Sequence, residues 1–226
     1  MIKTDSANDP VAQATLWGRD HLELVFVRHG QPMPFADRPK GELLDPRLSP
    51  TGIAQAKATA SALAHETVDA VYSSDMARAR MTADLLAAPF DLAVHIVSEL
   101  REVGVHDRGT HPEAKTAEQW ADIGRDFVAS GRWEVFPMSE SGVVFRSRVV
   151  QAIDSIIEQH AADTRVVIAS HSGVINVYTA HVLKVTKDYF FRPAHGSVTR
   201  FWSAGATRVL WSVNEHRHLA RDLFTG

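Results

Sequence analysis

The chain has 226 residues, of which 45% are hydrophobic and 23% are charged, a balance typical of a globular protein. Its formal net charge of −3 provides no overall basic surface, so we expect no nucleic-acid partner. No stretch approaches the roughly 20 apolar residues that span a bilayer, so we expect no membrane partner. The absence of cysteine excludes disulfides, thiolate catalysis and cysteine zinc sites.

The first 20 residues are polar and mixed in character. They lack the basic start and the apolar run of a secretory signal. We therefore expect residues 1–20 to form a flexible leader, and we expect a cytoplasmic location.

The first predicted element is an apolar strand over 22–27, which stops at Arg28-His29-Gly30. The segment 31–46 is rich in proline, and its length favours a functional loop. Ser49 followed by Pro50 predicts a helix from 50 to about 64 with Ser49 as its N-cap. A short strand over 69–72 comes next. Ser73-Ser74-Asp75 is then expected to cap a helix over 76–87, and a third strand follows over 93–97.

The segment 103–142 has many glycines, prolines and histidines, and one helix is predicted within it at about 117–128. We interpret it as an inserted helical lid. A long helix over 143–160 precedes a strand over 165–169, a helix to about 183, two antiparallel strands over 197–202 and 207–213, and a polar tail over 215–226. This alternation predicts an α/β fold, with a single three-layer domain over 21–214 and a mostly parallel central sheet flanked by helices.

Polar side chains follow several of the predicted strands. The segments that carry them are Arg28-His29-Gly30, Ser74-Asp75-Met76-Ala77-Arg78, Leu100-Arg101-Glu102 and Ser170-His171-Ser172-Gly173. The carboxyl ends of parallel strands converge on one crevice, so these groups should meet there. A neutral imidazole can attack phosphorus, guanidinium groups can hold phosphoryl oxygens, and a carboxylic acid can protonate a leaving alkoxide. The set therefore favours phosphoryl transfer through a phosphohistidine.

These motifs resemble those of the histidine phosphatase superfamily, also called the phosphoglycerate mutase-like family, over about residues 22–213. Arg28-His29-Gly30 is similar to the family signature, and Arg78 matches its second arginine. Glu102, after Leu100 and before Gly104, matches the Leu-x-Glu acid, and His171 matches the second histidine.

The resemblance implies a role for each of these residues. His29 would be the nucleophile that becomes phosphorylated, while Arg28 and Arg78 would clamp the phosphoryl oxygens. His171 would stabilise the transferring group. Glu102 would act as general acid and then as base for the attacking water. The family chemistry needs no metal and no other cofactor.

Three further residues are expected to bind substrate. Ser172 and Gly173 open a helix whose amides favour a nearby anion. Many relatives have an asparagine shortly after the signature, which this chain lacks, and Gln31 is the candidate substitute. Pro32 beside it has no backbone donor.

Some positions have rivals. Arg80 competes with Arg78, and Glu99 competes with Glu102, although the family pattern favours Arg78 and Glu102. His106 and His111 in the lid, and His195 before the last strands, are more often solvated loop residues, so their roles stay open.

The resulting hypothesis is a metal-independent phosphomonoesterase that acts on a small phosphorylated metabolite. Phosphoglycerate mutase-type transfer is the alternative. It is disfavoured because the chain between Glu102 and His171 has no tyrosine and a single lysine, Lys115. A phosphoprotein phosphatase and a non-catalytic phosphate-binding protein are weaker alternatives. A homodimer is left open, since dimers are the commonest oligomers.

Overall fold

The computed structural model describes residues 21–39, 45–104, 117–136 and 139–226. The expected leader over 1–20 lies outside the described residues. So do His106 and His111, together with the part of the expected lid that holds them.

One six-stranded mixed sheet forms the centre of the molecule, in the order β3-β2-β4-β1-β5-β6. Strands β1 to β4 are parallel to one another, whereas β5 pairs antiparallel with both β1 and β6. The strands are β1 (Leu22–Arg28), β2 (Ala70–Ser73), β3 (Val94–Ile96), β4 (Arg165–Ser170), β5 (Val198–Ala204) and β6 (Thr207–Glu215).

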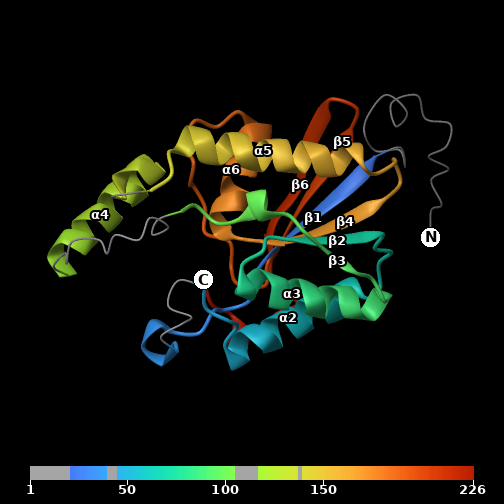
Figure 1. The fold of residues 1–226 in the computed structure, drawn as a ribbon, viewed down its shortest axis with the longest axis horizontal. Helices are drawn as coiled ribbons and strands as arrows, with labels where there is room; N and C mark the ends of the chain where they lie inside the picture. The colour runs from blue at the N-terminus through green and yellow to red at the C-terminus, as the bar shows by residue number, and fades with distance from the viewer. Residues whose placement is uncertain (1–20, 40–44, 105–116, 137–138) are drawn as a thin grey trace, which may run out of the picture.

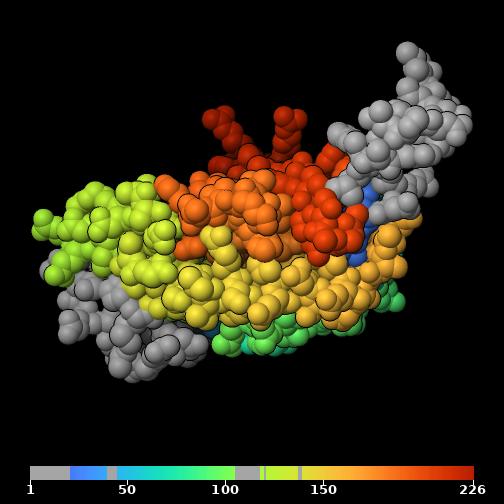
Figure 2. Space-filling view, turned by 90° about the horizontal axis from the view of Figure 1, so that it is seen from above, coloured from blue at the N-terminus to red at the C-terminus, as the bar shows by residue number. Residues whose placement is uncertain are grey.

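Helices cover both faces of this sheet, as Figure 1 shows. α2 (Pro50–Leu63) and α3 (Ala77–Ala87) lie on one face, and α5 (Gly142–Glu158) and α6 (Ser172–Leu183) lie on the other. α4 (Ala117–Ser130) projects beyond one end of the molecule, and α5 and α6 run side by side in the space-filling view (Figure 2). None of the described helices has the length and apolar character needed to cross a bilayer. Short 3-10 helices are η2 (Phe35–Asp37), η4 (Ala88–Phe90), η5 (Ser98–Leu100), η6 (Trp133–Val135) and η7 (Arg221–Leu223).

The three layers follow from the alternation of side chains along the strands. In β1, Leu24 and Phe26 belong to the apolar cluster under α5 and α6, whereas Val25 and Val27 belong to the cluster under α2 and α3. Successive side chains of a strand point to opposite faces, so a strand that is apolar throughout must be buried on both. The predicted α/β fold is confirmed.

The expected cap of α3 is wrong. The N-cap residue is Met76, which makes no side-chain capping bond. The first free amide of the helix, Ala77 N, instead donates to both oxygens of Asp45, at 2.9 and 3.1 Å. A carboxylate from a distant loop takes the capping position, while Ser74 Oγ accepts from Met76 N at 3.4 Å and also makes a contact described below.

The segment 215–226, expected to be a polar tail, packs against the body of the protein. Gln55 Nε2 in α2 donates to the carbonyl of Leu223 at 2.6 Å and to Thr225 Oγ1 at 2.8 Å. His195 N donates to the carbonyl of Thr225 at 2.9 Å. The segment therefore ties α2 to the loop before β5.

Candidate active site

His29 follows directly on β1 and is buried, with 5% of its surface exposed. Its Nδ1 lies 2.7 Å from the carbonyl oxygen of Gly30, and Arg78 Nε donates to its Nε2 at 3.1 Å. Because a guanidinium has no acceptor, Nε2 must carry the lone pair and Nδ1 the hydrogen. Burial first, and then the charges of Arg78 and Arg28, hold the pKa of His29 well below its usual range. The imidazole is therefore neutral, with Nε2 available as a nucleophile.

The register of the sheet brings the second histidine to the first. Arg28 at the end of β1 pairs with Ser170 at the end of β4, so His29 and His171 both lie one residue beyond the sheet. Their ring centroids are 5.1 Å apart. His171 is buried and its Nε2 lies 2.7 Å from Ser74 Oγ, at the end of β2. Three neighbouring parallel strands thus deliver these groups to one place.

Two arginines flank the histidine pair. Arg78 lies in the first turn of α3, and its side chain is 11% exposed and 3.7 Å from Asp45. Arg28 Nη2 lies 2.9 Å from His195 Nε2, and its Nη1 donates to the carbonyl of Pro193. Burial is the largest influence on both arginines, and it lowers the pKa of Arg28 to about 10, so both remain charged near neutrality. Two desolvated guanidinium groups form a strong anion site.

Glu102 provides the carboxyl group of the cluster. Its Oε2 accepts from Gly173 N at 3.0 Å, and its Oε1 accepts from Val103 N at 3.0 Å. Its charge acts on both Arg28 and Arg78. The first amides of α6 thus include one, at Gly173, that donates to the side chain of Glu102.

Two glycines permit this close packing. An ideal Cβ on Gly173 would lie 2.2 Å from Glu102 Oε1, and one on Gly30 would lie 2.2 Å from the carbonyl oxygen of Gly52. Distances this short mean that a side chain at either position must displace its neighbour. Glycine is therefore needed at both for steric reasons.

The three expected substrate-binding residues have partners within the protein. Gln31 Oε1 accepts from Ser49 Oγ at 3.0 Å, and Gln31 N donates to Gln55 Oε1 at 2.7 Å. Ser172 Oγ lies 2.9 Å from the hydroxyl of Tyr189. Gln31, Ser172 and Gly173 thus border the cluster, and their role toward a substrate stays a prediction.

The alternative candidates for the second arginine and for the acid differ from the clustered residues in burial. Arg80 and Glu99 are both exposed, and Glu99 Oε2 accepts from Ser98 Oγ at 3.1 Å. The structure thus brings together Arg28, His29, Arg78, Glu102 and His171, the five residues that the sequence analysis selected as catalytic.

Sequence reasoning assigned no role to the residues that hold this cluster in place, although it left His195 open as a candidate. Ser74 contacts His171, Asp45 pairs with Arg78, and His195 contacts Arg28. The only signal for Ser74 was its place at a strand end. Asp45 and His195 come from loops whose path the sequence pattern does not specify.

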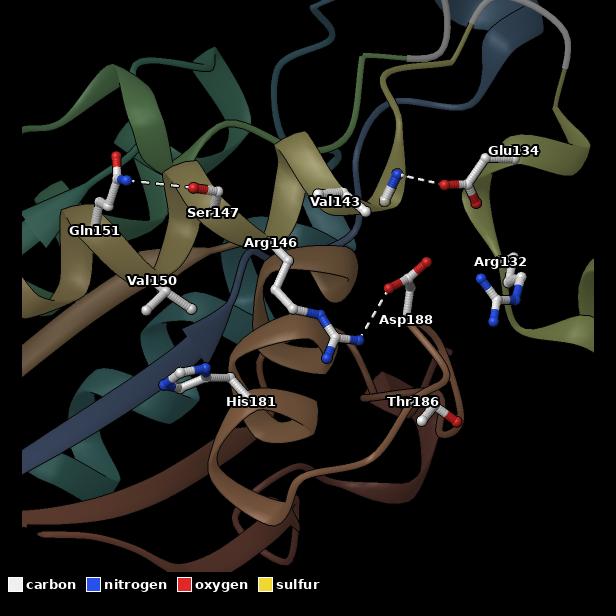
Figure 3. Close-up of a pocket in the computed structure, with 11 residues that line it drawn as sticks. Arg132, Glu134, Val143, Arg146, Ser147, Val150, Gln151, His181, Thr186 and Asp188 are labelled. Atoms are coloured by element: carbon white, nitrogen blue, oxygen red, sulfur yellow. Dashed lines mark hydrogen bonds and ion pairs between the residues drawn. The ribbon is translucent and has the colours of Figure 1, made fainter.

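A hollow of about 570 Å³ lies elsewhere, between α5, the end of α6 and η6, and it is shown in Figure 3. Its Arg146 is 3.0 Å from Asp188 and also donates to two backbone carbonyls, while Glu134 accepts from Gly142 N at 2.8 Å. Arg146 and Asp188 therefore form an ion pair, Glu134 is bound by a backbone amide, and none of the five clustered residues lines the hollow. Among the described residues, no group of three or more His, Asp or Glu side chains is arranged to hold a metal ion.

The sequence profile of the histidine phosphatase superfamily (branch 1) matches residues 24–215 of this chain. The chain belongs to this superfamily. An adenosylcobalamin/alpha-ribazole phosphatase of Salmonella typhimurium is 29% identical over 193 residues, which cover 81% of this chain and 89% of that protein. A glucosyl-3-phosphoglycerate phosphatase of Mycolicibacterium vanbaalenii is 33% identical over 174 residues, or 73% and 76% of the two chains.

Solved structures agree with this assignment of the histidine phosphatase fold. A mycobacterial glucosyl-3-phosphoglycerate phosphatase in complex with VO3 superimposes with a TM-score of 0.71 and 25% identity. The superposition covers 86% of this chain and 99% of that structure. Together with the family match and the named relatives, it identifies this protein as a phosphatase.

Proposed function

We propose that this histidine phosphatase hydrolyses a small phosphomonoester through a covalent phosphohistidine at His29, without a metal ion. The observation that carries the proposal is the state of the His29 ring. Nδ1 donates to the Gly30 carbonyl, and the lone pair of Nε2 points to the guanidinium of Arg78. A nitrogen that is neutral, buried and next to a fixed cation is suited to attack a phosphoryl group.

In the first step, His29 Nε2 forms a bond to phosphorus and the bond between phosphorus and the ester oxygen breaks. Arg28 and Arg78 neutralise the charge on the transferring oxygens. His171, which lies beside the His29 ring, also stabilises the transferring group. Glu102 must enter this step in its protonated form, and it gives that proton to the leaving alkoxide. In the second step, Glu102 takes a proton from water, which attacks the phosphohistidine and releases phosphate and free His29.

The proposed substrate class rests on the relatives. The phosphatases described above are named for alpha-ribazole and for glucosyl-3-phosphoglycerate, which supports a small phosphorylated metabolite for this chain. Mutase-type transfer remains the alternative, and the test below separates it from hydrolysis.

The test is phosphate release from a panel of metabolite phosphates and para-nitrophenyl phosphate, with chelator present throughout. The panel includes 3-phosphoglycerate, and formation of 2-phosphoglycerate is measured separately. A labelled substrate is quenched in alkali to trap phosphohistidine, in the wild type and in His29→Asn.

We expect phosphate release that resists the chelator, and a labelled intermediate that disappears in His29→Asn. Release that requires added metal, or a labelled intermediate that persists without His29, contradicts the mechanism. Isomerisation without net phosphate release would assign mutase-type transfer instead.

A further inference from the structure

Arg28 contacts two residues outside the family motifs, the backbone of Pro193 and the side chain of His195. The guanidinium Nη2 lies 2.9 Å from His195 Nε2, and Nη1 donates to the carbonyl of Pro193. Arg28 Nε is buried and has no hydrogen-bond partner among the described residues. The contacts on one side of the guanidinium thus fix its orientation and leave Nε–H for another acceptor.

The contact with Arg28 determines the tautomer of His195. A guanidinium only donates, so His195 Nε2 must accept and the hydrogen must be on Nδ1. His195 Nδ1 lies 2.9 Å from Thr225 Oγ1, which is the acceptor this tautomer requires. His195 itself is buried, with 9% of its surface exposed.

Thr225 has a second connection to the site. Its Oγ1 accepts from Gln55 Nε2 at 2.8 Å, and Gln55 Oε1 accepts from Gln31 N at 2.7 Å, next to the Gly30 turn. One hydroxyl therefore connects to both sides of the Arg28-His29-Gly30 signature. On one side the connection runs through His195 to Arg28, and on the other it runs through Gln55 to the backbone after Gly30.

We propose that His195 and Thr225 are positioning residues for the phosphate clamp: Thr225 accepts from Nδ1–H of His195 and supports the tautomer whose Nε2 orients Arg28 toward the phosphoryl group. This deepens the proposed function and rests on it for the identity of the anion. The opposite tautomer would place an N–H against the guanidinium, and two facing donors repel. Loss of the Thr225 hydroxyl removes one acceptor of Nδ1–H and weakens the preference for this tautomer.

The electrostatic surroundings of His195 support this reading. Burial is the largest influence, and the charges of Arg28, Arg192 and Arg78 add to it, while the bond to the Thr225 backbone opposes it. Together they lower the pKa of His195 to about 3. The ring therefore stays neutral near neutral pH, as an acceptor for a guanidinium must be.

The first test compares Thr225→Val with Thr225→Ser in the full chain. Valine keeps the shape of threonine and removes the hydroxyl, whereas serine keeps the hydroxyl. Thr164→Val is the matched control, because the hydroxyl of Thr164 donates to the nearby Ala161 carbonyl at the opposite end of β4, away from the clustered residues. The readouts are kcat/KM, inhibition by inorganic phosphate, and the nitrogen chemical shifts of the His195 ring, assigned by their loss in His195→Gln.

In the wild type we expect the His195 nitrogens to report Nδ1–H and an unprotonated Nε2. In Thr225→Val we expect a shift toward the other tautomer, a loss in kcat/KM of about threefold to tenfold, and phosphate inhibition weakened by a similar factor. Thr225→Ser and Thr164→Val should resemble the wild type in all three readouts. A protonated Nε2 in the wild type, or equal effects of Thr225→Val and Thr225→Ser, would overturn the proposal.

A second pair of variants checks His195 directly. The amide oxygen of glutamine can still accept from Arg28, so His195→Gln should retain more of the phosphate affinity than His195→Leu, and equal losses would contradict the positioning role. Thermal unfolding of both variants shows whether the leucine protein is folded.

The ring chemical shifts and the binding of inorganic phosphate can be measured without turnover. They therefore decide this proposal even where no substrate of the panel is hydrolysed, a result that would count against the proposed function alone.

Discussion

The floor of the site and its side wall are built in different ways. The floor consists of Arg28, His29, Arg78 and His171, which come from strand ends and the first turn of a helix, and each has a polar partner within the protein. The wall consists of Glu102 and the aromatic cluster of Phe127, Trp133, Phe136 and Tyr189 that adjoins it.

This difference separates two tasks. The floor is fixed by the register of parallel strands, so in the proposed mechanism it presents the same anion site to every ester. The shape of the wall, in contrast, depends on how side chains of α4, η6 and the loop after α6 pack against one another. We expect changes in the wall to depend on the leaving group, and changes in the floor to affect every substrate.

The largest effect expected from the wall is that of Glu102→Gln. Glutamine cannot donate the proton, so alkyl phosphates with poor leaving groups should lose about 10²–10⁴ in kcat. Aryl phosphates need no proton and should lose far less. The exposed neighbour variant Glu99→Gln is the control and should leave both rates unchanged. Equal losses on alkyl and aryl substrates would remove Glu102 from the role of acid.

A smaller effect is expected from Gly173→Ala, at the boundary between floor and wall. The new Cβ would lie 2.2 Å from Glu102 Oε1 and 3.0 Å from Trp133 Cζ2, so the carboxylate must move. A displacement of this size should lower kcat by about tenfold to a hundredfold, with the same dependence on leaving group.

Gly124→Ala in α4 is the control for that variant, since nothing lies within 4 Å of its ideal Cβ. It should keep full activity. Full activity in Gly173→Ala as well would mean that the position of the carboxylate does not limit the reaction. Steady-state rates on one alkyl and one aryl phosphate are sufficient for both variants.

The smallest expected effect is a pH-dependent loss of folding stability at His195, which contacts Arg28 of the floor. The pKa of His195 is about 3 in the folded protein and about 6.5 in an unfolded chain, so below pH 6.5 protons bind to the unfolded state first. Stability therefore decreases as the pH is lowered. Between about pH 7.5 and 5.5, His195 alone should lower the free energy of unfolding by about 1.4 kcal/mol. Urea unfolding at both pH values should show this part of the loss in the wild type and not in His195→Gln. The same pH dependence in both proteins would contradict a buried, neutral His195.

The sequence alone determined the α/β order of elements and the five clustered residues, because both depend on local pattern. Runs such as 22–27 and 165–169 are apolar throughout, which requires burial on both faces, and residues that follow parallel strands must meet at one edge of the sheet. The helix beginning at Pro50 was predicted from an equally local signal, since Ser49 Oγ accepts from Gly52 N within the same turn.

The supports of the site depended on the tertiary structure. Met76 stands at the N-cap of α3 because Asp45 reaches its first amide from a loop 32 residues away in the chain. Thr225 is 30 residues from His195 and 170 from Gln55, and it contacts both. Hydrogen bonds over such separations leave no periodicity or spacing in the sequence, because they depend on where packing brings two loops together. The clustered groups were therefore visible in the sequence, and the contacts that orient them were visible only in the fold.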